Sequence, residues 1–437
     1  MFNDIKLLNK GDRLMNGSYT EEEKERLSTR NILLFVIGKF ISLFGASIYS
    51  FAVGLYILKI TGSGTSFALA LVFASVPRII FGPIAGTIAD RFNRKTIIIL
   101  TEVLSGSLMF FMIAYAYFYG LPIGLLYTSE VLLAIFSTFF SVTASSSIPS
   151  MAGDKSIQKA QSLNQSASSL AGILGPISAG ILYGLLSIEE IFLLTGTTFM
   201  IAGIVELFII FNLYAKKIVD QGKEKFLKSL TEGFSYLKEN DFLFSLLKVS
   251  LWLNFFFAGI NVAIPYILNH TLEFSSQTYG IAASMVSVGA LITSLIISSR
   301  PEMKNKLRKI RMGLTGLALM VILIGIPPML GISSEFINVS YYIIVLGLIG
   351  SIIMVVNIPI HVLIQRTTPS QYLGRIFGFV ETIASAISPL GMILFGILLD
   401  YIPAYFIPFI SGFSLLLISL LAMTNAKEPK EASEMAS

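Results

Sequence analysis

Six ionisable side chains interrupt long apolar stretches of this 437-residue sequence, and their types are suited to chemistry. They are Lys39, Arg78, Glu102, Glu130, Glu206 and Glu381. An ionisable group inside a lipid-embedded helix costs at least about 2.5 kcal/mol at the helix centre, so such groups usually face a partner or a water-filled cavity. A carboxylate in such a place can exchange protons and couple a proton gradient to another process. Glu206 and Glu381 are the candidates for that role.

The other ionisable groups have structural explanations as well. Lys39 and Glu102 lie near one end of their apolar stretches, where snorkelling to the interface or an ion pair explains them equally well. Arg78 lies nearer the middle of its stretch and is expected to pair with a carboxylate. His361 is expected to be packed and hydrogen-bonded, and a titrating role remains open.

Asn254 precedes three consecutive phenylalanines, Phe255–Phe257. An aromatic cavity there would suit amphipathic or cationic molecules, and a lipid-facing cluster is the alternative. Metal catalysis and bound cofactors are not expected, because the sequence has no cysteine and only two histidines, far apart. The stretch Gly153–Ser156 imitates the end of a phosphate-binding loop but lacks the glycine directly before Lys155, and no nucleophile motif is present. We therefore expect no enzyme.

The composition indicates the medium in which these groups lie. Apolar residues make up 54% of the sequence and charged residues only 13%, against roughly 25% charged residues in soluble domains. Twelve apolar runs approach the length of about 20 residues that crosses a bilayer as a helix. They are approximately 32–58, 66–89, 96–118, 125–147, 163–186, 191–213, 246–268, 280–298, 312–332, 341–364, 376–399 and 404–423. The basic residues lie between these runs, which favours a lipid bilayer over nucleic acid as the partner despite the net charge of +5.

The basic residues also predict which connections face the cytoplasm, because Lys and Arg resist translocation. Alternate connections are rich in them, while the intervening connections 187–190 and 269–277 have none, and only Lys59 breaks the pattern. Both termini are therefore predicted to be cytoplasmic, in a multi-pass protein of the cell membrane. Because the first 30 residues are polar and charged, we expect no cleavable signal peptide.

A long polar connection divides the predicted spans into two sets of six. The predicted boundaries are a cytoplasmic N-terminal tail over 1–30, a six-helix bundle over 31–213, a cytoplasmic central loop over 214–244, a second six-helix bundle over 245–424 and a cytoplasmic C-terminal tail over 425–437. This arrangement is typical of transporters built from repeats, whose site lies between the halves near the bilayer midplane.

The connection after the second predicted span carries the most specific motif. It contains Gly86, Asp90, Arg91, Arg94 and Lys95. Here the chain resembles the major facilitator superfamily, whose signature loop has a glycine, an aspartate and basic residues in the same order. The resemblance implies an all-α membrane protein of twelve transmembrane helices in two six-helix pseudo-repeat bundles.

The same resemblance implies a gating role for this loop. In the superfamily, the aspartate at the position of Asp90 meets the cytoplasmic start of the eleventh helix, where a helix N-terminus favours a negative charge. Gly374 and Arg375 belong to that facing segment, and Gly86 would let the helix ends approach. These contacts would favour the state closed on the cytoplasmic side. A solvated cluster of topogenic charges is the alternative explanation.

Two departures from the superfamily pattern limit the comparison. Asn93 stands where a glycine is usual in the loop, which affects the backbone of the turn but no charged position. The segments around Gly38, Arg78 and 365–375 resemble the branch of macrolide and siderophore exporters, but Lys39 stands where that branch is expected to have glutamine. A different substrate preference follows from this second departure.

Small residues recur in the fifth predicted span, at spacings that let helices approach closely. Gly172, Gly175, Pro176 and Gly180 resemble the glycine-proline motif of drug and proton antiporters, with Ala179 in place of one glycine. This resemblance favours export over uptake. Ordinary tight packing between membrane helices is the alternative.

Together these patterns predict a secondary active transporter that works by alternating access, with proton-coupled efflux of a drug-like or amphipathic small molecule. An uptake symporter is the first alternative. A membrane receptor that transports nothing, the membrane subunit of an ATP-driven pump and an intramembrane enzyme belong to other classes. The expected partners are a small-molecule substrate and the lipid bilayer, and the protein is expected to act as a monomer.

Overall fold

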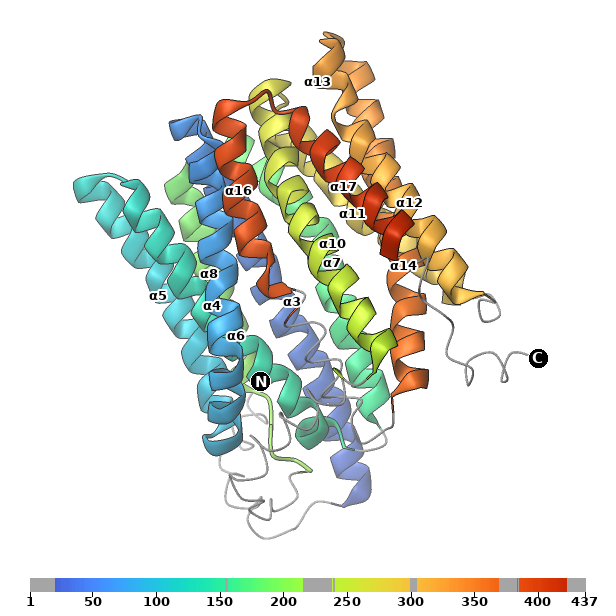
Figure 1. The fold of residues 1–437 in the computed structure, drawn as a ribbon. Helices are drawn as coiled ribbons and strands as arrows, with labels where there is room; N and C mark the ends of the chain where they lie inside the picture. Colours follow the sequence, from blue (N-terminus) through green and yellow to red (C-terminus); the bar gives the residue numbers. More distant parts are fainter. Residues whose placement is uncertain are drawn as a thin grey trace.

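The computed structural model describes residues 20–153, 156–214, 238, 240–298, 305–368, 383 and 385–422. The described elements are all helical (Figure 1). They are α3 (Glu21–Thr61), α4 (Gly64–Arg91), α5 (Arg94–Tyr119), α6 (Ile123–Ala152), α7 (Ile157–Leu185), α8 (Ile188–Leu207), α10 (Asp241–Pro265), η2 (Tyr266–Thr271), α11 (Ser276–Ser298), α12 (Lys306–Ile324), α13 (Ile326–Leu330), α14 (Glu335–Thr367), α16 (Ser388–Tyr401) and α17 (Phe406–Ala422).

Ten candidate spans in the described part of the chain are long and apolar enough to cross a membrane. The helices α16 and α17, which correspond to the last two predicted runs, are shorter and apolar. Most of the predicted run before Ser388 lies outside the described residues. The C-terminal tail predicted over 425–437 also lies outside them, as do residues 1–19 of the predicted N-terminal tail and residues 215–237 of the predicted central loop.

The first helix begins earlier than the apolar run predicted. Thr20 and Glu23 form a reciprocal capping box, in which the Glu23 amide donates to Thr20 Oγ1 at 3.2 Å and the Thr20 amide donates to the Glu23 carboxylate at 3.1 Å. Capping satisfies amides that a helix start leaves without partners. As a result, α3 includes the last ten residues of the segment predicted as a tail.

The sixth span ends earlier than predicted, at Leu207 instead of near residue 213. The side chain of Asn31 forms two hydrogen bonds with the backbone of Ile210. The Asn31 side-chain nitrogen donates to the Ile210 carbonyl oxygen at 2.9 Å, and the Ile210 amide donates to the Asn31 side-chain oxygen at 3.2 Å. These bonds replace helical ones, so residues 208–214 turn back against α3 and α6, where the Tyr214 amide donates to the Ser150 carbonyl. The apolar sequence continues beyond Leu207 and therefore did not indicate that the helix ends there.

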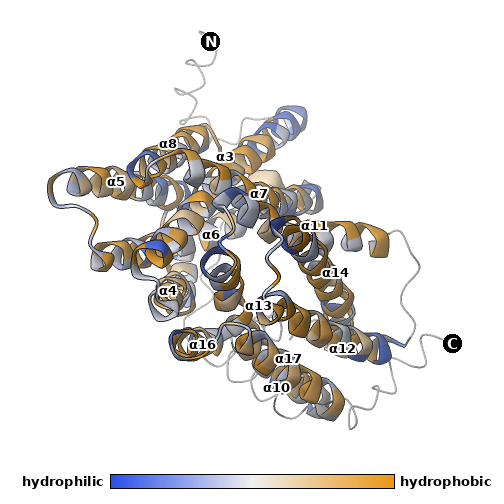
Figure 2. Cartoon of the chain, turned by 90° about the horizontal axis from the view of Figure 1, so that it is seen from above, coloured by the Kyte–Doolittle hydropathy of each residue, from blue (hydrophilic) through white to orange (hydrophobic). Residues whose placement is uncertain are grey.

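The helices α3 to α8 form one half of the molecule, and α10 to α17 form the other (Figures 1 and 2). The outer faces are rich in apolar side chains, as the colouring of Figure 2 shows, and many of them are exposed in the structure. A surface of this kind suits contact with lipid. We call the end of the molecule at which α3 begins the Glu21 end and the opposite end the Thr61 end.

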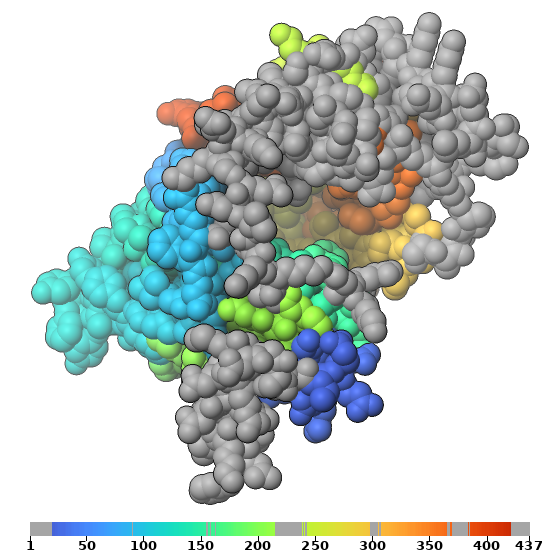
Figure 3. Space-filling view, turned by 90° about the horizontal axis from the view of Figure 1, so that it is seen from below, coloured from blue at the N-terminus to red at the C-terminus, as the bar shows by residue number. Residues whose placement is uncertain are grey.

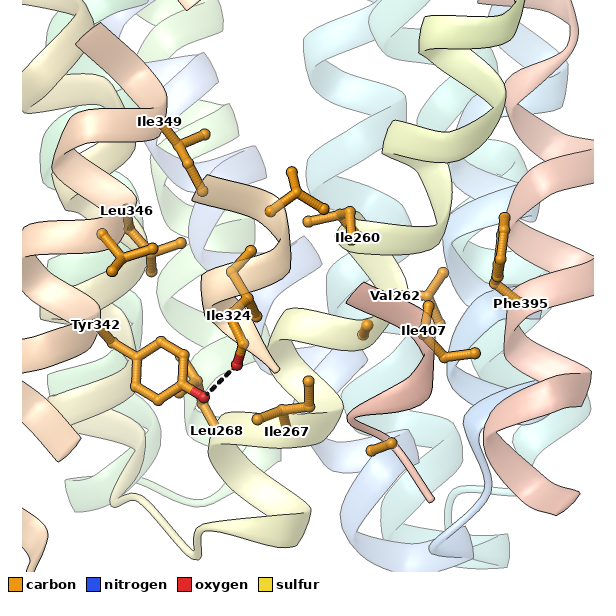
Figure 4. Close-up of a cluster of buried hydrophobic side chains, with 14 of the residues drawn as sticks. Ile260, Val262, Ile267, Leu268, Ile324, Tyr342, Leu346, Ile349, Phe395 and Ile407 are labelled. Atoms are coloured by element: carbon orange, nitrogen blue, oxygen red, sulfur yellow. Dashed lines mark hydrogen bonds between the residues drawn. The ribbon is translucent and has the colours of Figure 1, made fainter. Parts of the chain in front are cut away.

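In the part of the chain that the structure describes, the halves share a hydrophobic core at one end and have separate cores at the other. Toward the Thr61 end, Leu58 and Phe67 of the first half pack in one cluster with residues of the second half. Ile267 and Phe395 are among the second-half members, which Figure 4 shows. Toward the Glu21 end the buried cores are separate: one surrounds Phe35 in the first half, and two others lie wholly in the second half. In Figure 3, which views this end, the surface is hollowed where grey atoms do not cover it, between the green and the orange helices.

Candidate functional site

A cavity of about 330 Å³ lies in the half of the second bundle nearer the Glu21 end. It is bounded by α10, α12 and α14, with Ser385 beside them. Its lining combines apolar side chains, such as Leu253 and Phe257, with the hydrogen-bonding side chains of Ser250, Asn254, Asn357, His361 and Ser385. A mostly apolar pocket with a few polar groups is the usual form of a small-molecule site.

Two helices present the amide groups of this cavity. On α10, Asn254 lines the cavity, and its amide nitrogen donates to the Ser250 carbonyl oxygen at 2.9 Å. On α14, Asn357 and His361 are exposed and stand one helical turn apart. The predicted cavity residue Asn254 therefore does line a cavity, and His361 lines the same one.

Lys39 lies on α3, where only 6% of its surface is exposed. Its ammonium group donates to the amide oxygen of Asn164 on α7 at 2.5 Å. This contact differs from both the snorkelling and the ion pair that the sequence suggested. Asn164 was not predicted, because nothing in the sequence links it to a residue 125 positions away.

Glu102 and Glu206 form a pair of carboxylates inside the first half. They lie on α5 and α8, are 2% and 1% exposed, and interact electrostatically. One oxygen of Glu102 accepts a hydrogen bond from Ser42 at 2.7 Å. Among the described residues, the other oxygen of Glu102 and both oxygens of Glu206 have no hydrogen-bond partner. The remaining candidate, Glu381, lies outside the described residues.

Gly38 makes room for this carboxylate pair. A Cβ atom at Gly38 would lie 3.0 Å from Glu206 Cγ and 3.2 Å from Glu206 Oε1, tighter than ordinary contacts. A Cβ atom at Gly203 would lie 3.3 Å from the Cβ of Glu102. The three helices α3, α5 and α8 therefore approach closely around two acidic side chains, which isolates them from lipid.

Arg78 and Glu130 lie on the neighbouring helices α4 and α6. Glu130 is 4% exposed, while Arg78 is exposed, and the two charges act on each other. The expectation that Arg78 forms a direct pair with a carboxylate stays a prediction.

The signature loop is anchored to its own half. The Arg94 guanidinium donates to the carbonyl oxygens of Ser146 at 2.9 Å and of Ala89 at 3.3 Å. The Lys95 ammonium donates to the Leu207 carbonyl at 2.5 Å, and Arg91 is exposed. The Asp90 side chain, Gly374 and Arg375 lie outside what the structure describes, so their predicted contact stays a prediction.

Asn93 replaces the usual glycine of this loop without strain. It caps the start of α5 by accepting a bond from the Lys95 amide at 3.0 Å, in an extended backbone conformation with φ of −65°. Any residue adopts that conformation. A Cβ atom at Gly86 would meet only Val142 of the same half, at 4.0 Å, so Gly86 has no close approach to a described residue of the other half.

The small residues of α7 serve two contacts. Gly175 faces α3, because a Cβ atom there would collide with Ser47. Gly172 and Gly180 face α11 of the other half, where Ser287 donates to the Gly172 carbonyl at 3.2 Å. A Cβ atom at Gly180 would lie 3.2 Å from the Cα of Gly280. This part of the predicted antiporter-like motif therefore packs the two halves together.

Sequence comparison identifies relatives over most of the chain. A model of the Major Facilitator Superfamily matches residues 35–391. The uncharacterized MFS-type transporter YfiS of Bacillus subtilis is 26% identical over 376 residues, which cover 84% of this chain and 86% of YfiS. Macrolide efflux protein A of Streptococcus pyogenes is 23% identical over 370 residues, which cover 84% of this chain and 88% of that protein.

Solved structures of other transporters share the fold. The nucleoside transporter NupG has a TM-score of 0.70 and 12% identity, over 91% of this chain and 100% of NupG. A bacterial homologue of the iron transporter ferroportin, in an inward-facing state, has a TM-score of 0.68 and 16% identity, over 91% of this chain and 98% of that chain. The structural similarity is thus to the fold, and the sequence match covers the signature loop and both halves: the chain belongs to the Major Facilitator Superfamily and is a multi-pass membrane transporter.

Proposed function

We propose that this protein is a secondary active transporter that exports an amphipathic, drug-like small molecule in exchange for protons. It works by alternating access, with twelve spans, both termini in the cytoplasm and the Glu21 end facing the cytoplasm. The proposed location is the cell membrane, and the proposed working unit is a monomer.

The division of the core carries the proposal of alternating access. The halves share one apolar cluster toward the Thr61 end and have separate clusters toward the Glu21 end. Such a molecule can change which end is open by rocking one half against the other about a site between them.

The direction and the substrate class rest on the relatives and on the cavity. Two of the relatives, from Streptococcus pyogenes and Enterococcus faecalis, are macrolide efflux proteins at 23% identity. The cavity on α10, α12 and α14 offers apolar surface together with amide and hydroxyl groups. These groups suit an amphipathic molecule with hydrogen-bonding edges.

Proton coupling rests on Glu102 and Glu206. Two adjacent carboxylates that are nearly fully buried, with three oxygens lacking described partners, are costly to hold in the fully ionised form. A single proton shared between them removes most of that cost. Since α5 and α8 carry the pair and α3 packs against it through Ser42 and Gly38, movements between these helices would alter its access to water.

A counterflow assay in proteoliposomes without ATP tests the proposal. Purified protein should exchange external labelled erythromycin or ethidium for internal unlabelled compound, and an imposed proton gradient should drive net transport. In cells, expression should lower dye retention, whereas an uptake symporter would raise it. No solute movement under any ion gradient would refute secondary transport and leave a receptor or a partner-driven pump.

A further inference from the structure

Asp400 connects the two halves of the molecule at the Thr61 end. It lies in the last turn of α16 in the second half, and its carboxylate accepts four hydrogen bonds from the start of α4 in the first half. The donors are the Ser63 hydroxyl at 2.9 Å, the Gly64 amide at 2.6 Å, the Thr65 amide at 3.1 Å and the Thr65 hydroxyl at 2.5 Å. No pattern in the sequence relates these residues, which lie more than 330 positions apart.

The chemistry of a helix start explains why a carboxylate is suitable there. The first amides of a helix have no partner inside the helix and carry partial positive charge. At the start of α4, the Ser63 hydroxyl oxygen accepts a hydrogen bond from the Ser66 amide at 3.2 Å. The amides of Gly64 and Thr65 donate to Asp400 instead. Hydrogen bonds to an ionised acceptor are about twice as strong as neutral ones. The second half thus completes the cap of a helix in the first half.

Glycines bring these two helices close enough for the bonds to form. A Cβ atom at Gly64 would lie 2.6 Å from Leu399 Cβ and 2.9 Å from the Gly396 carbonyl oxygen. A Cβ atom at Gly396 would lie 3.0 Å from the Gly64 carbonyl oxygen. Backbone therefore meets backbone directly below the carboxylate.

Among the described residues, this close contact lies at the start of α4. Gly82, near the other end of the same helix, has no atom of a described residue within 4 Å of a Cβ position. The second crossing of the halves, between α7 and α11, also has its closest approach toward the Thr61 end, at Gly180 and Gly280. The bonds of Asp400 are consequently present in a conformation whose halves are joined at the Thr61 end.

We propose that Asp400 is a positioning residue that holds the Thr61 end closed through the start of α4. We call this set of contacts the Asp400 clamp, formed by Asp400 with Ser63, Gly64 and Thr65. Its role in transport rests on the proposed alternating access, because the clamp must open each time the Thr61 end opens. The clamp lies at the end opposite the signature loop. The clamp would therefore favour the state closed at the Thr61 end, and the signature loop the state closed at the Glu21 end.

The absence of cysteine in the sequence makes a direct test practical. Spin labels placed by Tyr119→Cys and Ser333→Cys report the distance between the halves at the Thr61 end. Both residues are exposed there: Tyr119 is the last residue of α5, and Ser333 lies in the connection before α14. In lipid nanodiscs, Asp400→Ala should lower the ratio of short to long distances by about tenfold, as expected for the loss of several charge-assisted bonds. Asp400→Asn should give a smaller shift in the same direction.

A matched control separates the clamp from a general effect of charge. Glu189 lies in the first turn of α8, at the same end. Its substitution by alanine removes one negative charge, as Asp400→Ala does, but removes none of the hydrogen bonds that Asp400 makes between the halves. Glu189→Ala should leave the distances unchanged. An unchanged distribution for Asp400→Ala, or an equal shift for Glu189→Ala, overturns the clamp.

A covalent replacement of the clamp gives a second readout that does not depend on the alanine variant folding. The double variant Thr65→Cys with Asp400→Cys should form a disulfide that fixes the short distance, and a reductant should release it. Failure of the disulfide to form in the parent conformation would also overturn the clamp. Because distances are measured without substrate, a protein that transports nothing would refute the proposed function while the clamp could still hold.

Discussion

The substitution Glu206→Gln tests the coupling mechanism, because glutamine keeps the size of the side chain and cannot release a proton. Glu206 is 1% exposed, and neither of its oxygens has a described hydrogen-bond partner. If its carboxylate were ionised in this state, its burial would cost several kcal/mol, and glutamine would stabilise the protein by a similar amount. If it holds a proton, the exchange of one neutral group for another should change stability by about 1 kcal/mol or less.

We expect the second outcome, with the thermal midpoint of the purified variant within about 2 °C of the parent. Gradient-driven transport should fall at least about tenfold, because the site can no longer release a proton. Counterflow, which needs no net proton movement, should remain. Glu189→Gln is the control, since it removes an exposed carboxylate of the same helix.

Two results would refute this reasoning. A rise of several kcal/mol in stability would mean that Glu206 is ionised in this state. Full gradient-driven transport by Glu206→Gln would remove it from the coupling step. If Glu381→Gln also retains gradient-driven transport, neither candidate predicted from the sequence carries the coupling.

Four other substitutions test three separate parts of the molecule. Asp90→Asn should reduce transport several-fold while membrane insertion, followed by cell fractionation, stays normal, and normal transport would reject the gating role of the loop. Gly280→Val should destabilise the protein by about 1–3 kcal/mol in thermal unfolding, because the added side chain would collide with the Pro176 carbonyl oxygen of the other half. An unchanged midpoint of thermal unfolding would contradict that packing. Asn254→Leu and Asn357→Leu should each weaken substrate binding by about tenfold in a counterflow titration, since each removes a polar group of the cavity, and unchanged affinity in both would place the substrate elsewhere.

Much of the architecture followed from patterns that are local in the chain. Apolar runs of bilayer length predicted the described helices in their order, because a lipid-embedded backbone must satisfy its hydrogen bonds within each helix. The signature loop at Gly86–Lys95 predicted the family, which the family match confirmed. The small residues of α7 predicted close helix packing, and Gly180 does approach the other half.

The residues that act together were decided by the tertiary structure. In the sequence, Asp400 is a polar residue after an apolar run, and Asn164 has no distinguishing context. In the structure, Asp400 accepts hydrogen bonds from the start of α4, and Asn164 accepts one from Lys39. Local periodicity specifies which face of a helix is apolar, but it carries no information on which distant helix lies against that face. The pairing of Glu102 with Glu206 and the closure of one end are likewise properties of how the two halves pack.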